Sequence, residues 1–98
     1  MTIRWTRLAN DDFLGIIGWI AATNPVAASS VGQRILDAVE RLEDFPFRGR
    51  PGRSPGTREL VISDLPYLVV YSVEAANRRT VVILRVLHGA MLWPPSGA

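Results

Sequence analysis

The last apolar run of the chain, TVVILRVLH at residues 80–88, contains two side chains that can do chemistry. His88 is the only histidine, and its imidazole can either shuttle a proton or make a structural hydrogen bond. Arg85 can bind an anionic group, but arginine does not serve as an ordinary proton-transfer base. Strand alternation puts Val82, Leu84, Val86 and His88 on one face, and Val81, Ile83, Arg85 and Leu87 on the other. Arg85 on this apolar face either meets a partner molecule or pairs with Glu59 or Glu74 across the sheet.

Composition limits the other chemistry that is available. All 11 basic residues are arginine, and the chain has no cysteine. Disulfides and thiolate chemistry are therefore excluded, and with a single histidine we expect no metal ion and no cofactor. A formal net charge of +2 is too small to indicate nucleic-acid binding by itself. The lack of cysteine is typical of a protein of the reducing cytoplasm.

A loop is predicted for FPFRGRPGRSPG, residues 45–56, which holds three prolines, three glycines and three arginines. Loops set on a rigid scaffold often carry function. Arg48, Arg50 and Arg53 are therefore either solvated positions of a connector or contacts for the anionic groups of a partner.

The first half of the chain predicts a short strand at residues 2–6 and then a helix. Phe13, Ile16, Ile17 and Ile20 recur with helical spacing. Asp11 and Asp12 suit the positive N-terminal end of this helix, for which Thr6 or Asn10 can be the cap. The two aspartates also argue against a signal peptide, and the ten apolar residues after them are too few to span a bilayer, so we expect no membrane association.

A second helix is predicted directly after the first. Asn24-Pro25 fits an N-cap followed by the first helical position, and the apolar stripe then continues to about Asp44. Because so few residues join the two helices, they are expected to pack as an antiparallel hairpin.

Three further strands are predicted at residues 58–63, 67–74 and 80–88. The links between them are short, which favours an antiparallel meander. The expected fold is therefore α+β, with the order β-α-α-β-β-β and the helical hairpin on one face of an antiparallel sheet. A chain of 98 residues forms one domain, 1–98, of which about 94–98 is expected to be a flexible tail.

Neither face of this sheet is polar in the sequence, yet two helices can cover only one of them. An exposed apolar face usually marks an interface, so we expect a docking surface there. The alternative is that Met91, Leu92 and Trp93 fold back over it.

The order of elements and three segments resemble a known family. GTREL at 56–60, LPYLVVYSV at 65–73 and ILRVLHGAMLWP at 83–94 are similar to the RelE/ParE superfamily of toxins from type II toxin-antitoxin systems, over nearly the whole chain. The RVLH ending followed by a small residue and methionine is closer to the ParE type. The resemblance implies a cytoplasmic toxin that a cognate antitoxin neutralises, with DNA gyrase as the target for the ParE type and mRNA on the ribosome for the RelE type.

The nuclease alternative needs a base, an acid and cations that stabilise the phosphorane. Glu59, Tyr71 and His88 could supply proton transfer, with Arg58 and Arg85 on the phosphate. RelE-type nucleases commonly have lysines, and they have cationic and tyrosine residues near the C-terminus. This chain has no lysine, and its GAMLWPP segment has no cationic or tyrosine residue.

The gyrase alternative needs binding and no proton transfer, and it is the one we favour. The residues expected to contact the target or the antitoxin are Arg48, Arg50, Arg53, Arg58, Arg85, His88, Met91 and Trp93, since tryptophan and arginine are enriched at interface hot spots. On this view the protein is not itself an enzyme. A third alternative is a non-toxic protein that retains only the antitoxin interface.

Overall fold

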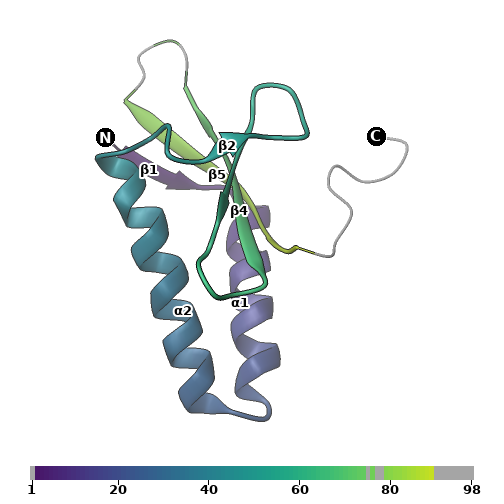
Figure 1. Ribbon diagram of the computed structural model, residues 1–98. Coiled ribbons are helices and arrows are strands. Elements are labelled where there is room, and N and C mark those ends of the chain that lie inside the picture. Colours follow the sequence, from purple (N-terminus) through teal and green to yellow (C-terminus); the bar gives the residue numbers. More distant parts are fainter. Residues whose placement is uncertain (1, 75, 77–78, 90–98) are drawn as a thin grey trace.

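The computed structural model describes residues 2–74, 76 and 79–89, which form a helical layer packed on a sheet (Figure 1). The elements in chain order are β1 (Thr2–Trp5), α1 (Arg7–Ala21), α2 (Pro25–Glu40), the 3-10 helix η1 (Arg41–Glu43), β2 (Arg50–Pro51), β3 (Arg58–Val61), β4 (Tyr67–Val73) and β5 (Thr80–His88). The α+β class and the order of the predicted elements are confirmed. The short strand β2 is an addition, and it lies within the segment predicted as a loop.

The two helices begin at the residues that their capping chemistry favours. Thr6 caps α1, because its Oγ1 accepts a hydrogen bond of 3.1 Å from the backbone N–H of Ala9. Asn24 caps α2 through its Oδ1, and Pro25 occupies the first turn, where a missing N–H costs nothing. In the part of the chain that is described, neither helix has the length and apolar character needed to cross a bilayer.

The sheet is mixed, with the strand order β1-β5-β4-β3-β2. The antiparallel meander of β3, β4 and β5 is as predicted, but β1 pairs with β5 in the parallel direction. Short links fix the antiparallel direction only for strands that they join. Because the helical hairpin separates β1 from the meander, no such link sets its direction, and the expectation of an entirely antiparallel sheet is wrong for this strand.

The main core lies between the helical hairpin and one face of the sheet. Figure 1 shows α1 and α2 side by side, with the turn between them at the far end from β1. The largest apolar side chains that this layer buries completely are Ile35 and Leu42 after the hairpin turn and Tyr71 and Ile83 on the central strands. Burial of side chains of this size contributes about 1.5 to 3 kcal/mol each.

One extra residue in β5 changes which side chains share a face. Tyr71 pairs with Ile83 and Val70 with Arg85, so Leu84 is unmatched and forms a β-bulge. As a result Val86 joins Val81 and Ile83 in the main core, while Leu84 and Leu87 join the cluster on the other face. Regular alternation through β5 was therefore the wrong expectation, because a bulge of one residue reverses the faces beyond it.

The bulge is held by α1 through Asp12. Its Oδ2 accepts hydrogen bonds from Arg85 Nε at 2.7 Å and from the Val86 backbone N–H at 3.0 Å, and its Oδ1 accepts from Arg85 Nη2 at 3.0 Å. The expected partners Glu59 and Glu74 do not form this ion pair. A bidentate pair of this kind is among the stronger side-chain hydrogen bonds, and Arg85 is four-fifths buried in it.

The helix-free face carries a smaller cluster made of Leu68, Val70 and Leu87, with Leu84 packed against it. The first three are 5% exposed or less, so a docking surface on this face is limited to what remains open, such as Val61 at 55% exposure. The expectation that residues 91–93 cover this face falls outside the described residues.

We predict that Asp12→Ala lowers the free energy of unfolding by about 2 to 3 kcal/mol, because it leaves a largely buried guanidinium and a strand N–H without their acceptor. Arg4→Gln is the control, since Arg4 and Glu74 form an exposed ion pair of 3.6 Å that is expected to contribute less than about 1 kcal/mol. Urea denaturation of both variants measures this. Equal losses would show that Asp12 is no more important than a surface charge.

Candidate functional site

The candidate residues on the sheet lie in three separate places. Arg58, Glu59 and Tyr71 surround the segment at residues 46–53, which folds against β3 and β4. Arg85 lies in the same cross-strand row as Glu59, because both pair with Val70, but two strand spacings separate them, or about 10 Å. Arg85 is bound to α1 as described above.

His88 ends β5 opposite Tyr67, whose ring it meets edge-on at 5.8 Å between centroids. Tyr67 is four residues from Tyr71 along β4, which corresponds to about 13 Å. The exposed imidazole borders an open groove against α1 that Asp11 and Trp19 also line. The fold therefore does not place His88 beside Glu59 or Tyr71, as a shared acid–base pair would require.

The Tyr71 hydroxyl is buried and has two backbone partners. It accepts a hydrogen bond from the Gly49 N–H and donates one to the Pro46 carbonyl, both at 2.8 Å. The approach is so close that a Cβ on Gly49 would lie 2.7 Å from the hydroxyl oxygen. This hydroxyl fixes the position of the loop, and its proton is already committed to a carbonyl.

Arg58, which pairs with Tyr71 across β3 and β4, binds the same loop. Its Nε donates to the Gly49 carbonyl at 2.9 Å and its Nη2 to the Phe47 carbonyl at 3.1 Å. The guanidinium also lies over the Phe47 ring, 5.4 Å from its centroid. Arg58 and Tyr71 together hold residues 46–49 against the sheet.

Glu59 is the only charged side chain that is fully buried among the described residues, with 2% exposure. Its Oε1 accepts from Arg50 Nη2 at 3.2 Å and lies 3.5 Å from Arg53 Nε, and its Oε2 accepts from the Arg53 backbone N–H at 2.9 Å. Burial alone would raise the pKa of Glu59, but the hydrogen bonds and charges of the two arginines outweigh it, so this pKa lies below its ordinary value. Glu59 is therefore an ionised carboxylate that holds two loop arginines.

The remaining candidates differ in their surroundings. Arg48 is exposed, and its side chain makes no hydrogen bond or ion pair among the described residues, unlike the side chains of Arg50 and Arg53. Met91 and Trp93 lie outside the described residues. Within the part of the chain that the structure describes, no three acidic or histidine side chains gather as a metal site would need.

Two arginines that the sequence reading did not single out, Arg34 and Arg41, lie near Arg48 in one pocket. Arg34 lies on α2 and Arg41 directly follows it, at the start of η1; their spacing of seven residues favours the same side of the helix and could have identified them. The contribution of Arg48 comes from a loop, and no sequence pattern relates that loop to α2.

We predict that Tyr71→Phe lowers the free energy of unfolding by about 1 to 3 kcal/mol, because it leaves the buried Gly49 N–H without an acceptor. Tyr67→Phe, on the same strand, is the control and is expected to change the stability less. Thermal or urea denaturation measures both variants. A neutral Tyr71→Phe would mean that the hydroxyl does not hold the loop.

The lowered pKa of Glu59 predicts a pH dependence of stability. A carboxyl whose pKa is lower in the folded state stabilises the fold above the unfolded value, which is near 4.5, and this contribution is lost as the pH falls below that value. The difference in unfolding free energy between the wild type and Glu59→Gln should therefore be largest near pH 7 and should shrink towards pH 3. Glu43→Gln, at an exposed carboxylate, is the control. A difference that stays constant over this range would contradict the ion-paired state of Glu59.

Comparison with known proteins agrees with this architecture. The chain is 42% identical to "Putative toxin Y4kP" of Sinorhizobium fredii over 92 residues, which are 94% of this chain and 92% of that protein. It is 34% identical to "Toxin RelE2" of Caulobacter vibrioides over 88 residues, 90% of this chain and 94% of that protein.

Two solved structures have a similar fold. The chromosomal ParDE toxin-antitoxin system of P. aeruginosa contains a chain that superposes with a TM-score of 0.78 at 27% identity, covering 90% of this chain and 95% of that one. The toxin-antitoxin complex RelBE2 of Mycobacterium tuberculosis gives a TM-score of 0.58 at 29% identity, covering 89% and 95%. Residues 3–93 match the family described as "ParE toxin of type II toxin-antitoxin system, parDE", and the chain therefore belongs to the ParE family of type II toxins.

Proposed function

We propose that this toxin acts by binding and poisoning DNA gyrase, without catalysing a reaction of its own. The observation that carries the proposal is the use of the candidate acid–base groups for structure: the Glu59 carboxylate is buried between two arginines, and the Tyr71 hydroxyl is buried between two backbone groups. A gyrase poison needs only to bind an enzyme that already holds cleaved DNA.

Cleavage of RNA would ask more of these groups than their surroundings allow. A general base works best when its pKa lies near the working pH, and the arginines move the pKa of Glu59 in the opposite direction. His88 is exposed, but Glu59 and Tyr71 are too far along the sheet to act with it. The guanidinium groups of Arg58 and Arg85 are already bound to carbonyls and to Asp12.

We also propose that a cognate antitoxin binds and neutralises the toxin in the cytoplasm. The structural relatives from P. aeruginosa and M. tuberculosis are toxin-antitoxin systems, and this supports such a partner here. A short adjacent reading frame that encodes an antitoxin would support it further.

Contacts with the target are proposed for residues that retain unused donors or apolar surface. Arg48 is exposed, and the side chains of Arg50 and Arg53 keep about half of their surface open beside Glu59. His88, Met91 and Trp93 are proposed as further contacts, with Trp93 as an apolar hot spot. Arg58 and Arg85 would contribute by holding the scaffold that positions these contacts.

We predict that the purified protein inhibits gyrase supercoiling and that Trp93→Ala raises the inhibitory concentration about tenfold, the loss expected when one hot-spot side chain worth about 1.4 kcal/mol is removed. Trp19→Ala is the matched control, because Trp19 is 77% exposed on α1 and is not proposed to contact gyrase. Supercoiling assays with relaxed plasmid measure both variants.

Induction in cells separates the two targets. The proposal expects DNA-damage signalling and filamentation while translation continues at first. If translation instead stops within minutes, mRNAs are cut on the ribosome, and His88→Ala or Glu59→Ala with an intact fold abolishes the cutting, the protein is a nuclease and the proposal is wrong.

A further inference from the structure

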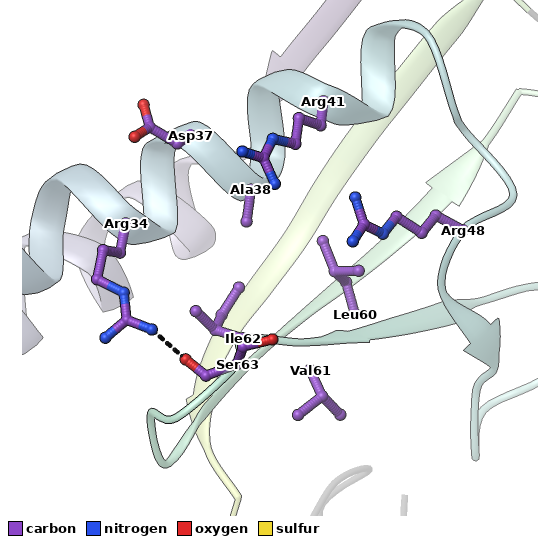
Figure 2. A pocket seen from close by; sticks show the side chains of 9 residues that line it. All are labelled: Arg34, Asp37, Ala38, Arg41, Arg48, Leu60, Val61, Ile62 and Ser63. Atoms are coloured by element: carbon purple, nitrogen blue, oxygen red, sulfur yellow. Dashed lines mark hydrogen bonds between the residues drawn. The ribbon is translucent and has the colours of Figure 1, made fainter.

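Three arginines surround a pocket between α2 and the end of β3. Figure 2 shows Arg34 and Arg41 descending from the helix and Arg48 reaching in from the loop. Leu60 and Ile62 lie between them as an apolar floor. We name these five residues the arginine pocket.

No ion pair among the described residues involves Arg41 or Arg48, although Asp37, Glu40, Glu43 and Asp44 line a neighbouring hollow with Arg41. Arg34 donates a side-chain hydrogen bond to the Ser63 carbonyl, whereas the guanidinium groups of Arg41 and Arg48 make no hydrogen bond or ion pair with the described residues. Asp37 is nearby, but its Oδ1 accepts from Gln33 Nε2 at 2.8 Å and its carboxylate points away from the floor in Figure 2. The pocket thus presents two guanidinium groups with their donors available to an anion.

The strand beside the pocket has an open edge. β2 pairs only with Arg58 and Glu59, so Leu60 and Val61 have β4 as their one partner strand in the described sheet. The Ile62 N–H points to β4, where it donates to the Tyr67 carbonyl at 3.1 Å. Because backbone groups alternate along a strand, the Val61 N–H and carbonyl point outward, where they can pair with a further strand.

Exposed apolar side chains occur on this edge and in the loop that carries Arg48. Val61 is 55% exposed, and Phe45 and Phe47, on either side of Pro46 in the loop before Arg48, are 63% and 52% exposed. An open strand edge, available guanidinium donors and exposed apolar side chains are the features that recognise an extended peptide through its backbone, its acidic side chains and its apolar side chains.

We propose that a partner protein inserts an extended acidic segment at this edge, as a strand beside Leu60 and Val61, with its carboxylates bound by Arg41 and Arg48. Nucleic-acid phosphates could satisfy the arginines, but they would leave the open strand edge and the apolar side chains without partners. The proposal deepens the function proposed above by giving the chemistry of one antitoxin segment, and it rests on that function for the identity of the partner.

The test measures the affinity of the toxin for the antitoxin encoded beside it. Arg41→Gln and Arg48→Gln should each weaken binding about tenfold, since each removes a charge-assisted hydrogen bond. Arg7→Gln is the matched control, because Arg7 is exposed on α1 and carries the same charge, and it should change the affinity less than twofold. Amide hydrogen exchange should show that the Val61 N–H becomes protected in the complex.

The outcomes separate this proposal from the proposed function. If the antitoxin binds all variants equally, or if the Val61 N–H stays unprotected, the proposed binding of an acidic segment at the β3 edge is wrong, and the antitoxin partnership still stands. If the antitoxin does not bind the wild type, the proposed antitoxin partnership is wrong. Titration with the peptide Val-Glu-Val-Glu-Val, compared with its glutamine analogue, then tests whether the arginine pocket binds an acidic segment. The proposal is overturned if the peptide does not bind, or if it binds the Arg41→Gln variant as tightly as the wild type. It is also overturned if a DNA oligonucleotide, and not the peptide, binds in a way that depends on Arg41.

Discussion

The Asp12 carboxylate fixes the relation between the helical layer and the sheet. It accepts from the Arg85 guanidinium and from the Val86 backbone N–H, at the bulge that Leu84 introduces into β5. β5 lies between β1 and β4 and packs against α1. A single side chain therefore satisfies the polar groups that the bulge would otherwise leave buried and sets where the end of β5, including His88, emerges beside α1.

The same physical principle organises the other end of the sheet. The Glu59 carboxylate binds two loop arginines, and the Tyr71 hydroxyl binds two backbone groups. A loop rich in proline and glycine therefore takes one position, although the two-residue strand β2 is its only regular structure. Buried polar groups need partners, and groups that have found them are poor acids and bases. Two cations whose side chains lack such partners among the described residues, Arg41 and Arg48, lie at the surface beside the open edge of β3, and this arrangement favours recognition of a partner over catalysis.

Local signals in the sequence were sufficient for much of the fold. Asn24-Pro25 predicted the helix boundary, and the short links predicted the meander of β3, β4 and β5, because capping and turn chemistry act between near neighbours. The parallel pairing of β1 and the bulge at Leu84 were missed, since both depend on contacts between segments far apart in the chain.

The candidate site shows the same limit more clearly. Residue type drew attention to Arg85, Glu59 and Tyr71, but it could not say that their partners would be Asp12, the loop arginines and two backbone groups. An arginine in an apolar strand gives no indication of which acid it meets, because that acid is 73 residues away. For the same reason the arginine pocket becomes visible only when the loop after α2 is folded.

The claim that the candidate catalytic groups serve structure is tested most directly by the ionisation of Glu59 itself. Carbon-13 NMR of the folded protein, with the side-chain carboxyl carbon of Glu59 assigned by comparison with Glu59→Gln, follows its titration. The account predicts a midpoint below the ordinary value of 4.5, because two arginines stabilise the carboxylate. A midpoint between about 6 and 8, where a general base would work, would contradict it.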